Sequence, residues 1–136
     1  MNKIKVYLGG AMEGCTDDEM HLWRNYFKLV FVDQIDFFDP TVRKININCF
    51  SDAEIVEQDK LDILNSDILL VNYTPKKSMI GSSMEVMYAF EHNKPIFVLW
   101  GRKEEVSPWI TFHATYIAKT LPEMIGELHD EYIRSN

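Results

Sequence analysis

Short apolar runs alternate with segments of helical periodicity along the 136 residues of this chain. The run from Ile68 to Tyr73 is apolar at almost every position, which is typical of a strand buried on both faces of a sheet. Similar runs cover residues 5–8, 35–38 and 96–100, and a weaker one covers 115–118. Strands that alternate with helices in this way predict βαβ units, a parallel sheet and right-handed crossovers.

Five strands in a chain of this length predict an α/β fold of the flavodoxin-like type, a three-layer sandwich around a five-stranded parallel sheet of order 2-1-3-4-5. The length fits one domain, residues 1–136. In this strand order the winding direction reverses between the first and third strands, and ligands bind at the carboxyl ends of the strands beside that switch point. We therefore expect the site in the loops 9–15 and 74–80 and at the helix start near Gly81.

Helix starts are marked by Ser or Thr with Glu three residues later, which is the spacing of a capping box. They are Thr16, Ser51 and Thr120. The first of these helices carries four apolar residues at helical spacing, which we expect to form its buried stripe: Leu22, Tyr26, Leu29 and Val30. An irregular stretch over 41–50 precedes the second helix, which is predicted to end near Asn65. A mostly apolar helix is predicted over Gly81–His92.

The charge balance narrows the possible partners. With 14 basic and 21 acidic side chains the formal net charge is −7, which disfavours DNA, RNA and other polyanions. The apolar runs fall far short of the ~20 residues that a membrane span needs. We therefore predict small-molecule partners, with no nucleic-acid polymer and no membrane.

The two cysteines, Cys15 and Cys49, lack the spacing of a metal site, and no signal peptide is evident. This indicates a reduced, cytoplasmic protein in which a disulfide between them is not expected. The glycines at 9, 10 and 14 do not form the spaced fingerprint of a dinucleotide fold, and the sequence has no phosphate-cradling P-loop. We expect no metal and no cofactor.

Glu85 is the first candidate for a catalytic group. It lies near the start of the helix at the switch point, and five apolar residues follow it. A carboxylate there is predicted to face the crevice, largely removed from water. The alternative is structural, because Ser82 and Glu85 also have capping-box spacing, and the local sequence does not decide between the two interpretations.

Two further side chains are candidates. Asp59 lies four residues after Ile55 and four before Ile63, so it shares their apolar stripe, where a carboxylate is costly unless it is paired, hydrogen-bonded or facing a cavity. It is therefore either a satisfied structural group or a carboxylate that points into the crevice; Asp62 is its more solvated rival. Tyr7, near the end of the first strand, is either a core residue or a donor to a carboxylate across the crevice.

The loops at the switch point are expected to hold a substrate. Three serines cluster around the helix start, where they could bind a phosphate or a sugar hydroxyl, although capping explains at least one of them more simply: Ser78, Ser82 and Ser83. The residues that we expect to contact the substrate are Gly9, Gly10, Met12, Ser78, Met79, Gly81 and Ser82.

Three stretches of sequence combine into a recognisable pattern. They are Lys5-Val-Tyr7-Leu-Gly-Gly10, then Asp59 followed by Asp67 within Asn65–Tyr73, and Gly81-Ser-Ser-Met-Glu85 with the apolar residues to Phe90. Over about residues 3 to 119 this pattern resembles the nucleoside 2-deoxyribosyltransferases and the related nucleotide N-glycosidases. The resemblance implies a flavodoxin-like fold, a homo-oligomer with sites near subunit interfaces, and cleavage of the N-glycosidic bond of a nucleoside.

The resemblance also implies a role for each candidate. By matching position, Glu85 is the nucleophile, Tyr7 orients and activates it, and Asp59 contacts or protonates the leaving nucleobase. These roles agree with glycosyl chemistry, in which a carboxylate stabilises an oxocarbenium-like state and then traps it covalently.

The sequence departs from the family pattern at three places. Met79 stands six residues before Glu85, where many transferases carry an acidic or hydroxyl residue. The segment 106–109 offers Ser107 and no Asn as the polar residue that relatives contribute from a neighbouring subunit. The loop 11–14 lacks the basic residue of phosphate-binding relatives, which favours nucleosides over 5′-monophosphates; Arg24 or Lys77 are the cations left to supply that charge.

We therefore expect a nucleoside 2-deoxyribosyltransferase of nucleotide salvage that forms a covalent glycosyl-enzyme on Glu85 and passes the sugar to another base. Its partners are a nucleoside and a nucleobase. One alternative is an N-glycosidase that hydrolyses nucleosides or their 5′-monophosphates. Another is a catalytically inactive nucleotide-binding module, which Met79 keeps open.

Overall fold

The computed structural model describes residues 3–42 and 51–133. Within them, five parallel strands form one sheet of order β2-β1-β3-β4-β5, which confirms the predicted α/β flavodoxin-like fold and its strand order. The strands are β1 (Ile4–Gly10), β2 (Ile35–Phe38), β3 (Ile68–Asn72), β4 (Ile96–Leu99) and β5 (Tyr116–Ala118). The helices are α1 (Asp17–Val30), η1 (Pro40–Val42), α2 (Asp52–Leu64), α3 (Ile80–Glu91), α4 (Pro108–His113) and α5 (Leu121–Tyr132). Cys49 and most of the predicted irregular stretch lie outside the described residues.

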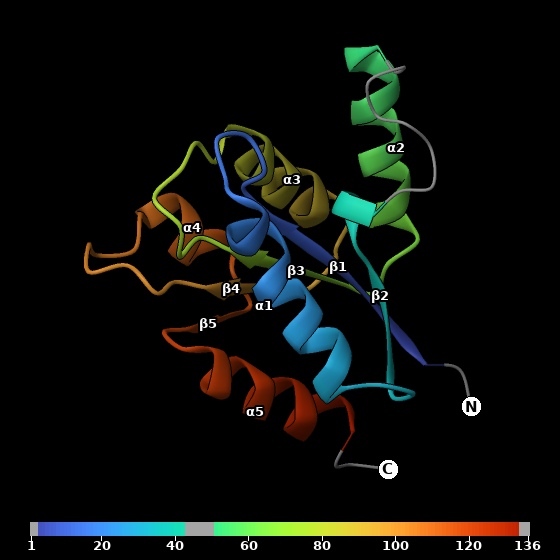
Figure 1. The fold of residues 1–136 in the computed structure, drawn as a ribbon, viewed down its shortest axis with the longest axis vertical. Coiled ribbons are helices and arrows are strands. Elements are labelled where there is room, and N and C mark those ends of the chain that lie inside the picture. Colours follow the sequence, from blue (N-terminus) through green and yellow to red (C-terminus); the bar gives the residue numbers. More distant parts are fainter. Residues whose placement is uncertain (1–2, 43–50, 134–136) are drawn as a thin grey trace.

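Helices cover both faces of the sheet (Figure 1). Alternate residues of each central strand point to opposite faces, so each strand contributes to two apolar clusters. In β3, Ile68 and Leu70 pack under α1 and α5, whereas Leu69 and Val71 pack under the helices α2, α3 and α4. A strand buried on both faces needs apolar residues at every position, which is why this run was recognisable in the sequence.

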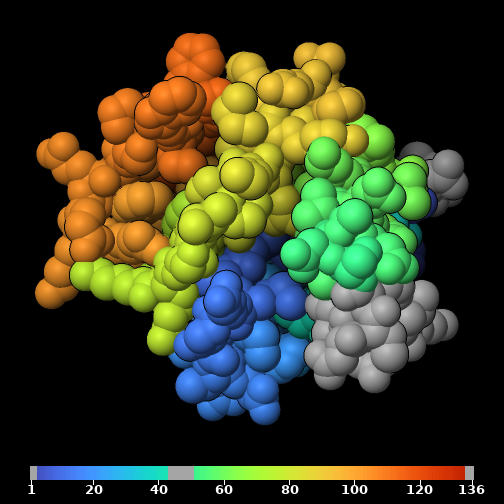
Figure 2. Space-filling model, turned by 90° about the horizontal axis from the view of Figure 1, so that it is seen from above, coloured from blue at the N-terminus to red at the C-terminus, as the bar shows by residue number. Residues whose placement is uncertain are grey.

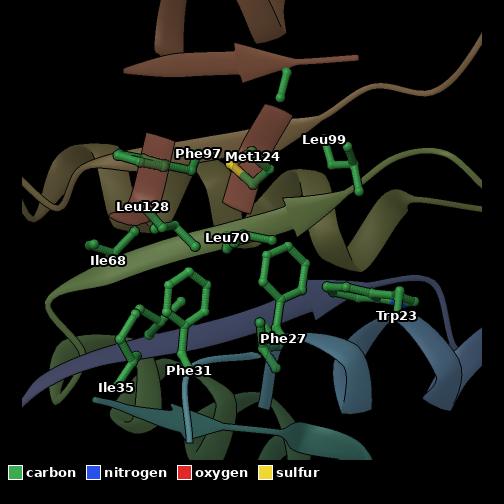
Figure 3. Packing of buried hydrophobic residues seen from close by; sticks show 13 residues of the cluster. Trp23, Phe27, Phe31, Ile35, Ile68, Leu70, Phe97, Leu99, Met124 and Leu128 are labelled. Atoms are coloured by element: carbon green, nitrogen blue, oxygen red, sulfur yellow. The ribbon is translucent and has the colours of Figure 1, made fainter. Parts of the chain in front are cut away.

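The cluster under α1 and α5 is built around aromatic rings. Figure 3 shows Phe27 and Phe31 of the α1 side pointing toward Met124 and Leu128 of α5 on the same face of the sheet. The rings of Trp23 and Phe27 meet edge to face, with their centroids 6.2 Å apart.

The predicted buried stripe of α1 is wrong. The four residues expected to face the core are exposed: Leu22, Tyr26, Leu29 and Val30. The helix instead buries Trp23, Arg24 and Phe27, and Phe31 at its C-cap continues the same face. Both sets have helical spacing, so periodicity alone could not separate them. The larger aromatic set removes more apolar surface from water, and it is the set that docks.

The capping predictions are confirmed at three helices. Thr16 and Ser51 form complete capping boxes with Glu19 and Glu54, and the Thr120 hydroxyl accepts from the Glu123 backbone N–H. None of the helices in residues 3–42 and 51–133 is both long and apolar enough to cross a membrane. In the same part of the chain, no group of three or more His, Cys, Asp or Glu side chains could hold a metal ion, and Cys15 is a free cysteine.

Candidate active site

The switch point of the sheet lies between β1 and β3, whose carboxyl ends are paired from Val6 with Ile68 to Gly10 with Asn72. The chain leaves β1 toward α1 on one face and leaves β3 toward α3 on the other. Figure 2 shows a hollow at this end of the molecule, between the segment after β1 (blue), the approach to α3 (yellow-green) and α2 (green). This is the place where the strand order predicts a ligand.

Glu85 and Tyr7 meet at the switch point. The Tyr7 phenol donates a hydrogen bond to the Glu85 carboxylate, with 2.7 Å between Oη and Oε2. Tyr7 is buried and Glu85 is half-buried. The carboxylate also lies close to β1, since a Cβ on Gly9 would stand 3.4 Å from Oε1. A phenol on a carboxylate favours its ionised form and fixes its orientation.

The capping-box interpretation of Ser82 and Glu85 is wrong. Helix α3 begins at Ile80 with Met79 as its N-cap, and among the described residues no side chain caps it. This start places Ser82 and Glu85 inside the helix instead of at its first unpaired N–H groups. The Glu85 side chain is directed to Tyr7, so the carboxylate is part of the crevice.

Asp59 lies across from Glu85 on α2. The two carboxylates line one pocket of about 350 Å³ between α2 and α3, which Gly81 and Ile63 also line. Asp59 is half-buried, as expected for a polar residue on an apolar helix stripe. Its rival Asp62 accepts a hydrogen bond from Gln58, with 2.9 Å between Nε2 and Oδ1, and is not among the residues that line this pocket.

The other residues expected to contact a substrate are spread around the switch point. Gly9 and Gly10 end β1, and Gly81 lines the pocket of Asp59 and Glu85. Ser82 is buried, Met12 is half-buried in the loop after β1, and Ser78 is exposed. Met79 lines a different cavity, between α3 and α4. The roles assigned to all of these residues stay predictions.

Sequence reasoning missed the part that Arg24 plays. Its side chain is fully buried beneath the end of β1 and donates to the backbone oxygens of Leu8, Met20 and Gly10, at 3.2, 2.6 and 3.3 Å. The expectation that Arg24 supplies a charge for phosphate is therefore wrong, because its donors hold the backbone of the strand and helix. The signal that could have revealed this role is a long polar side chain on the same face of α1 as Trp23 and Phe27.

Arg24 belongs to a buried ion cluster. Its Nε lies 3.7 Å from Oδ1 of Asp39, and Lys28 reaches the other oxygen at 2.6 Å. Burial lowers the pKa of the Arg24 guanidinium, while the charges of Asp39, Tyr7 and Glu85 act in the opposite direction. A guanidinium stays protonated under such shifts. A fixed positive charge therefore lies within electrostatic reach of Glu85.

Comparison with solved structures identifies the class of fold. A conserved protein from Enterococcus faecalis V583 superimposes with a TM-score of 0.75 at 13% identity, over 95% of this chain and 99% of that one. A 2-deoxyribosyltransferase from Bacillus psychrosaccharolyticus gives 0.72 at 14%, over 88% of each chain. A CMP N-glycosidase from Clostridium botulinum gives 0.67 at 17%, over 95% and 99%.

No protein-family model and no curated protein sequence matches the chain. The structural matches show that the chain has the fold shared by nucleoside 2-deoxyribosyltransferases and nucleotide N-glycosidases, as the sequence resemblance implied. At these identities the likeness defines the fold, and function has to be argued from the site.

Proposed function

We propose that the protein cleaves the N-glycosidic bond of a nucleoside and transfers the 2-deoxyribosyl group to a second nucleobase. The observation that carries the proposal is the 2.7 Å hydrogen bond from Tyr7 to Glu85 at the switch point. Asp59 on the wall of the same pocket gives a second carboxylate, as glycosyl chemistry requires. The fold shared with deoxyribosyltransferases supports the same class of reaction.

In the proposed reaction, Glu85 attacks the anomeric carbon as the bond from that carbon to the base nitrogen breaks. Asp59 in its acid form gives a proton to the leaving base, whose electron pair would otherwise develop negative charge. The nitrogen of a second base then attacks the anomeric carbon and releases Glu85, while its proton returns to Asp59. Two displacements give net retention and leave both carboxyl groups as they began.

Tyr7 and Arg24 act on the nucleophile without touching the sugar. The phenol holds the Glu85 carboxylate in one orientation, which lowers the entropic cost of attack. Arg24 fixes the carbonyl oxygens at the end of β1, the strand that carries Tyr7. Both are positioning residues in this scheme.

Hydrolysis is the alternative outcome of the same first step. A structural neighbour of the chain is a CMP N-glycosidase, and water in place of the second base would release free sugar or sugar phosphate. The half-buried state of Glu85 and Asp59 limits the access of water and favours transfer. A binding module without catalysis, suggested by Met79, would bind nucleotides and turn none over.

We also propose that the protein is a cytoplasmic homo-oligomer that serves nucleotide salvage. Two large apolar side chains at the start of α3 are mostly exposed in the single chain: Ile80 and Met84. Exposed apolar surface of this kind marks an interaction site, and a second copy of the chain is the partner that the family resemblance implies.

The test is a base-exchange assay. The protein is incubated with a deoxynucleoside and a different free base, and the products are separated by chromatography. Exchange is expected for the wild type, loss of exchange for Glu85→Gln and strong loss for Asp59→Asn. The matched controls Glu57→Gln and Asp62→Asn, on α2 and outside the pocket lining, should stay active. A folded protein that exchanges no donor and acceptor pair contradicts the proposal, and free sugar without an acceptor assigns hydrolysis.

A further inference from the structure

A second cavity, of about 500 Å³, lies between α3 and α4. Tyr73 and Trp100, which directly follow β3 and β4, contribute to its wall, and α3 contributes Ser83. Tyr7, Asp59 and Glu85 do not line it. Figure 1 shows α2 and α4 on either side of α3, so this cavity and the pocket of Asp59 flank the same helix. Cavities of this size hold small organic ligands.

The lining of this α3–α4 cavity is positively charged. Lys77 and Arg102 line it, and none of the described lining residues is acidic, although the whole chain carries −7. The hydrogen bonds of Arg102 to the backbone oxygens of Tyr73 and Pro75 use two of the five N–H donors of a guanidinium. Lys77 Nζ lies 3.8 Å from Oε1 of Glu19, farther than a charge-assisted hydrogen bond. Both cations are therefore placed to meet an anion.

The cavity also offers aromatic and hydroxyl groups. Trp109 on α4 is 72% exposed, and its indole lies nearly parallel to the ring of His113. An exposed indole is a platform on which a planar ring can stack. The hydroxyls of Tyr73 and Ser83 are hydrogen-bonded to each other at 2.9 Å on the wall between the two strands and α3. These groups suit a ligand with a flat ring and hydrogen-bonding substituents.

We infer that the α3–α4 cavity is a second binding site, for a planar aromatic ring that carries a phosphate, in the size class of a mononucleotide. The ring stacks on Trp109 and the phosphate binds Lys77 and Arg102. This site is separate from the crevice of Glu85, and it does not rest on the proposed function, because the residues that carry it take no part in the proposed reaction.

The test titrates adenosine 5′-monophosphate into the Glu85→Gln variant, which removes the proposed nucleophile, and follows binding by calorimetry. Saturable binding is expected. Lys77→Ala and Trp109→Ala, each added to Glu85→Gln, should weaken it about tenfold, the scale of one lost ion contact or one lost stacked base. Adenosine and inorganic phosphate should each bind more weakly than the monophosphate, because each lacks one half of the recognised group.

Two matched substitutions serve as controls. Lys76→Ala removes a neighbouring exposed cation that pairs with Glu104, and Phe112→Ala removes an exposed ring of α4; neither residue lines the cavity, so affinity should not change. Binding that Asp59→Asn weakens while Lys77→Ala and Trp109→Ala leave it unchanged would place the nucleotide in the crevice and overturn the inference. Absence of saturable binding would overturn it as well. Base exchange is measured separately and decides only the proposed function.

Discussion

The Tyr7 hydroxyl and the Glu85 carboxylate are 78 positions apart in the sequence and 2.7 Å apart in space. The contact joins the middle of β1 to the second turn of α3 beside the switch point of the sheet. Because Tyr7 is only 1% exposed, its hydroxyl donates this hydrogen bond in a place largely shielded from water. Tyr7 therefore fixes the orientation of Glu85 from a buried position in the sheet.

Removing that hydroxyl should impair catalysis more than folding. Tyr7→Phe keeps the ring in the core and deletes a hydrogen bond to a charged group, worth about 1.5–3 kcal/mol. If the bond orients the nucleophile, base exchange should fall roughly 10- to 100-fold. The measurement is kcat from the exchange assay, with thermal unfolding as the check on folding. Tyr26→Phe, on the exposed face of α1, is the control, and equal rates for both variants would contradict the role of Tyr7.

Arg24 should be a strong determinant of stability. Arg24→Met would leave the backbone oxygens of Leu8 and Gly10 without their buried donor and would break the ion pair with Asp39. Loss of one partner of a buried pair costs about 3–5 kcal/mol. Urea unfolding should show a lower midpoint with an unchanged slope. Arg24→Lys retains the charge but loses the planar fork, so an intermediate loss is expected.

The partly exposed partner of the same cluster provides the comparison. Lys28→Met removes the other cation near Asp39, but its side chain is 32% exposed and water can replace it. The loss of stability should therefore be clearly smaller than for Arg24→Met. A loss as large as that of Arg24→Met would mean that the ion pair, and not the hydrogen bonds to the backbone, dominates the cluster.

Asp39 should make the free energy of unfolding of the protein depend on pH in the acid range. Burial alone would raise the pKa of this carboxyl, but hydrogen bonds from Lys28 and Thr41 outweigh it and hold the pKa below its ordinary value of 3.8. A folded-state pKa below the unfolded one stabilises the fold at higher pH, and this contribution is lost as the pH falls through the lowered value. The free energy of unfolding of Asp39→Asn should therefore lie below that of wild type at pH 7 and approach it below pH 4.

The control for this pH dependence is Asp36→Asn. Asp36 is exposed and pairs with Lys3 at 4.0 Å, so its removal should change the free energy of unfolding by less than about 1 kcal/mol at any pH. Urea titrations from pH 7 down to pH 2, through and below the lowered pKa of Asp39, make the comparison. A difference between wild type and Asp39→Asn that stays constant with pH would contradict the assignment.

The parts of the fold that the sequence predicts are those fixed by local pattern. The run Ile68–Asn72 is buried on both faces, and Thr16 and Ser51 satisfy the first N–H groups of their own helices. The docking face of α1 was mispredicted because two residue sets share helical spacing, and contacts with β1, β3 and α5 choose between them. Tertiary contacts override periodicity at such positions.

The candidate site shows the same division. Glu85 was found by its place at the switch point, yet its spacing from Ser82 fitted a cap equally well. Tyr7, a residue of another strand, decides the orientation of its carboxylate. Arg24 was misassigned because its partners are backbone oxygens of β1 and α1, which no side-chain motif records. Local spacing names the candidates, and long-range contacts assign their geometry.

The exposed apolar side chains at the start of α3 should control assembly. If a second copy packs against this face, Ile80→Asp places a charge in the interface, where its desolvation is not repaid, and the assembly should dissociate to a smaller species. Leu22→Asp is the matched control, because Leu22 is exposed to a similar degree on α1, on the other face of the sheet. Sedimentation velocity measures both variants beside wild type. An effect of Leu22→Asp without one of Ile80→Asp would move the interface to α1, and a monomeric wild type would remove the oligomer from the proposal.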